Sequence, residues 1–142
     1  MTPLRDDVRA ALEIAPDASS RERTIDITTY GASTGKARRI EIWFHRVDGR
    51  WFLSGSPGRR DWYANLLGDP RLVVHLKHGI AADLPAKGVP ITDPDEKRRL
   101  VTLILRGLEA MGGWTTASAE NIDDWTQGSP LAEILFEESI TP

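Results

Sequence analysis

Two loops of this sequence combine small residues with bases, a mixture that suits the binding of phosphate. The first, residues 33–39, reads STGKARR, and the second, residues 54–60, reads SGSPGRR. Small residues leave backbone N–H groups exposed, and the bases that follow add positive charge. The second loop also precedes a predicted helix, whose N-terminus favours anions. Taken alone, the first loop is equally well a solvated basic turn, but the two loops flank one predicted hairpin and can reach the same ligand.

The charge of the chain is concentrated in the same region. Residues 36–60 hold seven bases and two acids, a local charge of +5. Because the net charge of the 142-residue chain is −3, the remaining residues together carry −8. Trp43, Trp51 and Trp62, three of the five tryptophans, lie in or beside this segment. The pattern indicates a local site for a flat, anionic ligand. It disfavours a nucleic-acid partner, which usually requires a basic domain.

Several chemistries are excluded or disfavoured by residue type. The chain has no cysteine, so disulfides, thiolate catalysis and cysteine-bound metal are excluded. His75 and His78 fall on opposite faces of a strand, and no metal site is expected. Residues 31–35 match the G-x-S-x-G nucleophile elbow, but a strand follows where that motif needs a helix. With no apolar run of membrane-spanning length and no signal-peptide core at the N-terminus, we expect no integral membrane segment and a cytoplasmic protein.

The elements that position these loops follow from hydrophobic periodicity. Residues 38–47 alternate as a strand, with Ile40, Ile42 and Phe44 on one face, and Asp48-Gly49 is a strong hairpin signal. The other elements expected before residue 93 are a helix at 3–14, strands at 24–30, 51–55 and 71–77, a short helix at 59–67, and a hairpin pair within 79–92.

The C-terminal third is expected to be helical. Asp93 with Glu96 forms a capping box, and Pro94 suits the first turn of a helix over residues 93–111. A short helix is expected at 121–127, and Ser129-Pro130 is expected to begin a final helix that runs through Glu137. Hairpins dominate and no βαβ repeat appears, which favours an α+β protein built on an antiparallel sheet or small barrel.

These motifs, in this order, resemble the deazaflavin-dependent nitroreductase family. The resemblance covers residues 24–78: the basic loop that starts at Thr34-Gly35, the Asp48-Gly49 hairpin, the Ser-Gly loop, then Trp62-Tyr63-x-Asn65-Leu66 and Asp69-Pro70. It implies a split β-barrel, an antiparallel FMN-binding-like fold with flanking helices, over one domain, residues 1–142. The barrel would take up about residues 24–92, and the C-terminal helices residues 93–138.

The resemblance also implies the cofactor, coenzyme F420, and the reaction, hydride transfer to a quinone, a nitroaromatic or an activated enone. The phosphate and acidic tail of the cofactor would be held by seven residues of the two loops, and Ile40, Glu41 and Ile42 would lie near its ring. Trp62 and Asn65 would pack under the loop. The seven loop residues are Thr34, Lys36, Arg38, Ser54, Ser56, Arg59 and Arg60.

Other interpretations stay open at this stage. Many family members have Pro-Leu where this chain has Glu41-Ile42, so FMN remains an alternative cofactor, as in pyridoxamine-phosphate-oxidase-like proteins on the same fold. A carrier of flavin or deazaflavin without enzymatic activity is a further alternative. The resemblance implies a homodimer. Trp114 and Trp125 are candidate walls of a substrate pocket or simple core residues, and neither Tyr30 nor Tyr63 can be assigned as a proton donor.

Overall fold

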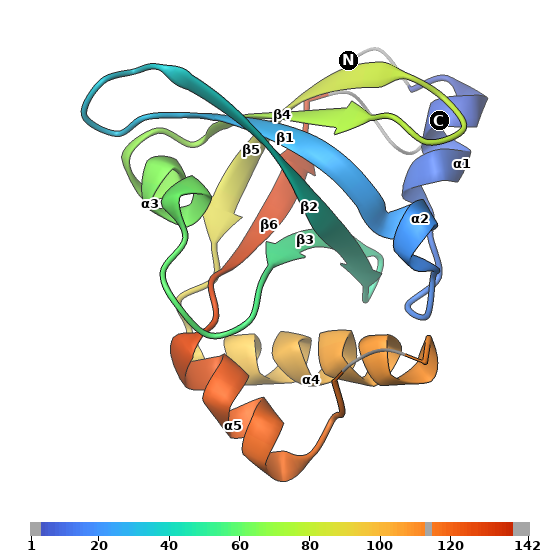
Figure 1. Ribbon diagram of the computed structural model, residues 1–142, viewed down its shortest axis with the longest axis vertical. Coiled ribbons are helices and arrows are strands. Elements are labelled where there is room, and N and C mark those ends of the chain that lie inside the picture. Colours follow the sequence, from blue (N-terminus) through green and yellow to red (C-terminus); the bar gives the residue numbers. More distant parts are fainter. Residues whose placement is uncertain (1–3, 113–114, 138–142) are drawn as a thin grey trace.

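The computed structural model of the chain describes residues 4–112 and 115–137, and these form a six-stranded antiparallel barrel with five helices around it (Figure 1). Neighbouring strands follow the order β1-β2-β3-β6-β5-β4 around the barrel, and β4 closes it by pairing with β1. The α+β barrel expected from the sequence is therefore confirmed. The elements are α1 (Asp6–Leu12), α2 (Ser20–Arg23), β1 (Thr24–Tyr30), β2 (Ala37–Val47), β3 (Arg50–Ser54), α3 (Asp61–Gly68), β4 (Arg71–Leu76), β5 (Ala82–Pro90), α4 (Pro94–Ala110), α5 (Ala119–Gly128) and β6 (Leu131–Phe136).

The final helix expected from Ser129-Pro130 through Glu137 is wrong, because this segment is the strand β6. Ala132, Ile134 and Phe136 contact the barrel core, while Glu133 and Leu135 point outward, so the alternation of a strand is satisfied. Its backbone pairs with β3 on one side and with β5 on the other. The barrel thus extends beyond residues 24–92 and requires β6 to close.

Two smaller expectations are also corrected. The hairpin pair expected within 79–92 is a single strand, β5, which pairs with β4 and β6 rather than with itself. The N-terminal helix expected over 3–14 is shorter, spanning Asp6–Leu12, and residues 1–3 lie outside the described part of the chain. A one-turn helix that the sequence did not suggest, α2, directly precedes β1. Its N-terminus is capped by a capping box between Ser19 and Glu22.

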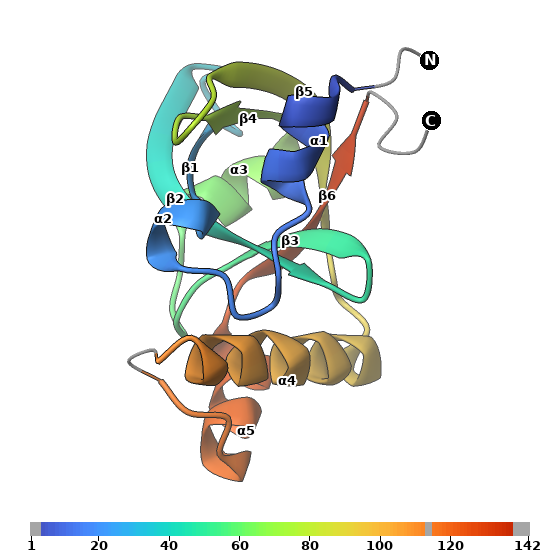
Figure 2. The same cartoon turned by 90° about the vertical axis from the view of Figure 1, so that its right-hand side faces the viewer.

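A second hydrophobic cluster attaches α4 and α5 to the outer face of the barrel. Helix α4 runs beneath the barrel and α5 packs below it (Figure 2). The Asp93 side chain caps α4 by accepting from the Glu96 N–H at 2.9 Å, as the sequence indicates. The apolar stripe of the helix buries Leu100, Ile104 and Leu108 against Phe52 of β3 and Leu131.

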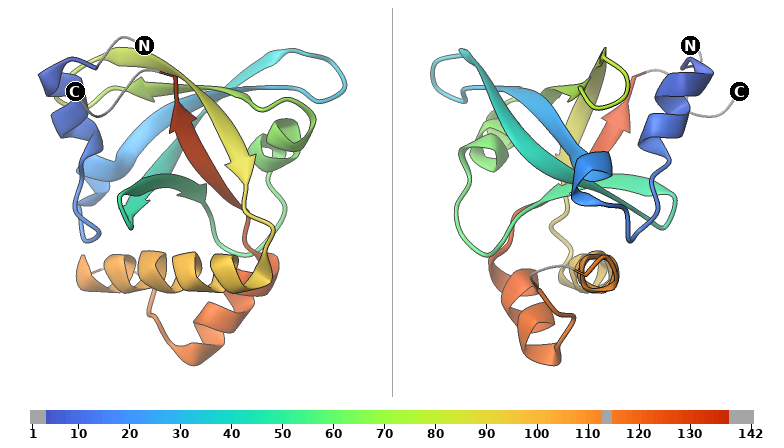
Figure 3. Two further views of the ribbon diagram at one scale, coloured as in Figure 1. Left: turned by 180° about the vertical axis from the view of Figure 1, so that it is seen from behind. Right: turned by 45° about the vertical axis from the view of Figure 1, so that its right-hand side comes forward.

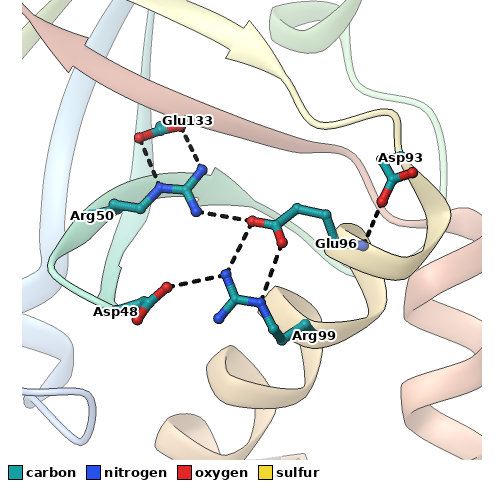
Figure 4. A network of polar contacts seen from close by, with 6 residues as sticks. All are labelled: Asp48, Arg50, Asp93, Glu96, Arg99 and Glu133. Carbon is teal, nitrogen blue, oxygen red and sulfur yellow. Dashed lines mark hydrogen bonds and ion pairs between the residues drawn. The ribbon is translucent and has the colours of Figure 1, made fainter.

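An ion-pair network also connects the first turns of α4 to the barrel (Figure 4). Arg50 of β3 donates two hydrogen bonds to Glu133 of β6, at 3.1 and 2.8 Å, and one to Glu96 of α4, at 2.9 Å. Arg99 joins Glu96 to Asp48 in the β2–β3 turn. The carboxylates of Glu133 and Glu96 hold the pKa of Arg50 above its usual range. The network therefore connects the hairpin, the closing strand and the helix in one place.

The strand β2 is longer than its partner β3, and this leaves part of one edge unpaired. Residues 37–43 of β2 pair with β1, whereas only residues 44–47 pair with β3. Among the described residues, no strand pairs with the second edge of residues 37–43. The β1–β2 hairpin projects from the barrel on the side of α3 in both front and rear views (Figures 1 and 3). Backbone N–H and C=O groups along this edge are available to a ligand.

Candidate active site

A polar cavity lies between the tip of the β1–β2 hairpin and α3, and we call it the basic cavity. It has a volume of about 350 Å³. The hairpin tip is shaped by its own backbone: the Gly35 N–H donates to the Gly31 carbonyl at 2.8 Å, and Gly35 adopts a φ of +70°. Helix α3 is held beside it by Asn65, whose Nδ2 donates to Thr29 Oγ1 at 3.1 Å. The lining residues are Gly31, Thr34, Lys36, Arg38, Asp61, Ala64 and Asn65.

The two bases of the basic cavity have no acidic partner in the described part of the chain. Neither Lys36 nor Arg38 forms an ion pair there, although Asp61 lines the same cavity. Arg39, the neighbour of Arg38 on the opposite face of β2, instead pairs with Asp26 at 3.0 Å. Two unpaired bases beside small-residue backbone are the donor set that phosphate and carboxylate groups prefer.

A second, smaller cavity of about 180 Å³ lies where β2 and β3 meet α4 and α5, and we call it the tryptophan cavity. Trp43 of β2 and Trp125 of α5 contribute its aromatic lining. The buried Ser54 hydroxyl donates to the Pro130 carbonyl at 2.8 Å, which ties the end of β3 to the start of β6. The full lining is Trp43, His45, Ser54, Gly55, Ser56, Leu108 and Trp125.

The histidine of the tryptophan cavity is held by a buried arginine. Arg23 is 1 % exposed, and its Nη1 lies 3.0 Å from His45 Nδ1. Its Nε donates to the Ala18 carbonyl at 3.0 Å and its Nη2 to the Pro16 carbonyl at 2.9 Å. Burial, together with the Arg23 charge, lowers the pKa of His45 to about 3. His45 is therefore neutral across the physiological pH range.

The two cavities lie at the two ends of one stretch of chain. Arg38 and Trp43 are five residues apart on β2, a distance of roughly 17 Å at the rise of an extended strand. The loop 54–60 starts in the tryptophan cavity, with Ser54 and Ser56, and leads to Asp61 in the basic cavity. The unpaired edge of β2 lies along the same stretch. Arg38 and Trp43 project from opposite faces of β2, so a ligand with its anionic end in the basic cavity places its flat end along the unpaired edge of the strand.

The structure brings some of the predicted site residues together and separates others. Thr34, Lys36, Arg38 and Asn65 share the basic cavity, and Ser54 and Ser56 share the tryptophan cavity. Ile40 is 38 % exposed on the partly unpaired stretch of β2, with Ile42 half-buried beyond it.

The remaining predicted residues line neither cavity. Glu41 points to the opposite face of β2, where Lys77 Nζ donates to it. Arg59 is exposed, and the guanidinium of Arg60 folds back onto the carbonyl of Ser56, at 3.0 Å. Trp62 is 5 % exposed and packs in the barrel core.

Two residues of the tryptophan cavity region were not among the predicted site residues. His45 had a signal, since the alternation of residues 38–47 places it on the same face as Trp43. Arg23 had none, because its contact with His45 joins positions far apart in sequence. Trp125, an expected pocket wall, lines the cavity and is also 6 % exposed in the second hydrophobic cluster, whereas Trp114 lies outside the described residues.

The described residues contain neither a cluster of metal-binding side chains nor a helix that could span a membrane. No group of three or more His, Cys, Asp or Glu side chains in residues 4–112 and 115–137 has the arrangement needed to hold a metal ion. Over the same ranges, no helix combines the length and apolar character needed to cross a membrane.

Comparison with solved structures identifies the fold. A conserved hypothetical protein from Mycobacterium tuberculosis superposes with a TM-score of 0.70 at 15% identity, covering 96% of this chain and 83% of that one. An FAD-binding protein from Mesorhizobium loti gives 0.62 at 13% identity, with 95% and 91% covered. A structure described as an F420-H2 dependent reductase gives 0.54 at 19% identity, with 79% and 93% covered. The chain is thus similar in fold to flavin- and deazaflavin-associated proteins, and the split β-barrel is confirmed.

Comparison at the level of sequence identifies the family. A search of curated proteins found no match. The sequence model of the F420H(2)-dependent quinone reductase family matches residues 18–110, which include both basic loops, the β2–β3 hairpin, α3 and the whole of α4. This match covers more than half of the chain. The chain therefore belongs to the F420H(2)-dependent quinone reductase family, whose members are deazaflavin-dependent oxidoreductases.

Proposed function

We propose that this protein binds reduced coenzyme F420, with its acidic tail in the basic cavity and its ring along the unpaired edge of β2, and catalyses hydride transfer to a quinone. The observation that carries the proposal is the pair of bases in the basic cavity, Lys36 and Arg38, which have no acidic partner among the described residues. A phosphodiester and acidic tail supply the negative charge that these bases lack. Membership of the family supports the same cofactor.

The residues present fit such a group. The unpaired edge of β2 offers backbone donors and acceptors to the polar rim of a flat ring. Ile40, exposed on that stretch, offers an apolar contact to a ring face. When bound, the reduced deazaflavin supplies the hydride, and the chain contributes positioning, exclusion of water and charge balance. A quinone that accepts the hydride also takes one proton, from solvent or from a group that the structure does not identify.

The experiment that tests this proposal is a fluorescence titration with F420. Lys36→Ala combined with Arg38→Ala removes two charge-assisted contacts, and we expect the Kd to rise by about 100-fold or more. The matched control is Arg21→Ala combined with Lys87→Ala, which changes net charge equally but lies on α2 and β5, away from both cavities. An affinity of the test variant equal to that of the control would remove the assignment of the basic cavity.

Two further measurements distinguish the alternative functions. Titration with FMN under the same conditions decides the cofactor, since tighter binding of FMN than of F420 would favour a flavin protein. Anaerobic turnover of reduced F420 is followed with a quinone, a nitroaromatic and an enone as acceptors. Saturable F420 binding without turnover of any acceptor would favour the carrier. Activity with the nitro compound or enone but not with the quinone would assign a different acceptor class.

We also propose that the protein acts as a homodimer, as the family resemblance implies. Light scattering coupled to size-exclusion chromatography then gives twice the chain mass of 15.8 kDa. A single-chain mass at concentrations used for activity would show that one chain forms the complete site.

A further inference from the structure

We infer that His45 is a neutral hydrogen-bond donor to a carbonyl oxygen, and that the tryptophan cavity binds the planar ring of the electron acceptor through it. The inference rests on the proposed function for the identity of that acceptor, a quinone. It assigns a specificity-determining role to His45 and a positioning role to Arg23.

The contact with Arg23 fixes the tautomer of His45. An arginine guanidinium has only donors, so the contact between Arg23 Nη1 and His45 Nδ1, at 3.0 Å, requires Nδ1 to accept. A neutral imidazole whose Nδ1 accepts carries its proton on Nε2. The Nε2–H group is on the opposite edge of the ring from Arg23, and the His45 side chain lines the tryptophan cavity.

Arg23 and His45 are held in a rigid arrangement. Arg23 cannot rotate freely because two backbone carbonyls, of Ala18 and Pro16, accept from its other nitrogens. Its guanidinium carbon also lies 5.8 Å from the centre of the Trp43 ring, within the range of a cation–π contact. The orientation of His45 is thus set before a ligand arrives, which reduces the entropy lost on binding.

The size and lining of the tryptophan cavity suit a small planar ligand. A cavity of about 180 Å³ has the volume of about six water molecules, which is enough for a small planar ring system. Trp43, Trp125 and Leu108 supply aromatic and apolar contacts. Because the His45 ring stays neutral, its Nε2–H group recognises a carbonyl oxygen and does not select a carboxylate. The positively charged basic cavity, in contrast, favours anionic groups. A quinone ring has this combination of a flat apolar body and carbonyl edges.

The test is calorimetric binding of menadione to the protein without reduced F420, so that no turnover occurs. The ligand cannot add to a thiol, since the chain has no cysteine. We expect menadione to bind about tenfold more tightly than 2-methylnaphthalene, which has the same ring without the carbonyl groups. Equal affinity for the two compounds, or binding of neither, would overturn the inference.

Two substitutions of His45 separate the donor from the fold. His45→Asn places an amide oxygen near the position of Nδ1, so Arg23 keeps an acceptor while the donor into the cavity is lost. His45→Gln places an amide NH₂ near the position of Nε2. We expect His45→Asn to remove the tenfold preference for menadione and His45→Gln to keep most of it. His78→Asn, in the β4–β5 turn and outside both cavities, is the matched control.

The outcome is distinguishable from failure of the proposed function. If F420 binds through Lys36 and Arg38 but menadione affinity is independent of His45, the inference fails and the proposed function stands. If F420 does not bind while menadione binding depends on His45, the proposed function fails alone. Competition between menadione and the isolated 8-hydroxy-5-deazaflavin ring for the His45-dependent site would assign the cavity to the cofactor ring and overturn the inference.

Discussion

Replacing Gly107 with alanine reverses the usual effect of that substitution in a helix. Gly107 lies in α4 against the loop that carries Pro16. A Cβ atom there would lie 2.2 Å from the Pro16 carbonyl oxygen and 2.9 Å from its carbonyl carbon. These are backbone atoms, which cannot rotate away, so α4 or the loop has to shift by roughly 1 Å to restore ordinary contact distances. The glycine is therefore required by the close approach of two segments.

The expected magnitude combines two opposing contributions. Helix propensity alone favours alanine over glycine by about 1 kcal/mol. Overpacking of this kind costs about 1–3 kcal/mol, and the shifted Pro16 carbonyl also weakens its 2.9 Å hydrogen bond from Arg23, a charge-assisted bond of about 1.5–3 kcal/mol. We expect the overpacking and the weakened bond to outweigh propensity by about 2 kcal/mol. At the size of this chain that lowers Tm by about 6 °C.

The assay is thermal and urea unfolding followed by far-UV circular dichroism. The control is Gly128→Ala in α5, where the added Cβ meets two carbons of Pro57, at 3.2 and 3.7 Å, so the change should stay below about 1 kcal/mol. A Gly107→Ala protein as stable as the wild type, or more stable, would refute the reasoning, because helix propensity would then be the only contribution that acts.

Two further predictions concern charge. Burial lowers the pKa of His45 to about 3, from its ordinary 6.5. Between these two pH values the unfolded chain binds a proton that the folded chain does not. The free energy of unfolding should therefore fall as the pH drops below 6.5, by about 2–3 kcal/mol at pH 4.5. Urea midpoints at pH 7.5 and 4.5 should show a smaller loss in His45→Asn, and equal losses in both proteins would contradict this. Glu133→Gln disrupts the bidentate ion pair with Arg50 in a partly buried network. It should lower the free energy of unfolding in urea by about 1–2 kcal/mol. The exposed pair Arg98–Asp123 provides the comparison, since Asp123→Asn should cost less than about 0.5 kcal/mol, and equal costs would show that the network adds nothing.

Local sequence was sufficient wherever pattern and turn chemistry agree. Asp48-Gly49 forms the hairpin with φ values of 58° and 69°, which few other residue pairs adopt without strain. Helix α4 begins at its predicted cap. The segment LAEILF failed this test, because alanine, leucine and glutamate favour a helix in isolation. The segment forms a strand because β3 and β5 both pair with it in the barrel. This pairing on two sides overrides its helix propensity.

The site divides in the same way. Composition by itself located the basic loop and the tryptophans, since charge and aromatic content are properties of residues and need no structure. Which bases are available to a ligand was decided by the tertiary structure: Arg39 is taken by Asp26, while Lys36 and Arg38, facing α3, are left without an acid among the described residues. The fixed proton of His45 depends on Arg23, 22 positions earlier in the chain. Periodicity reports which face of an element a side chain occupies, but hydrogen-bond partners across the barrel come only from how the elements pack.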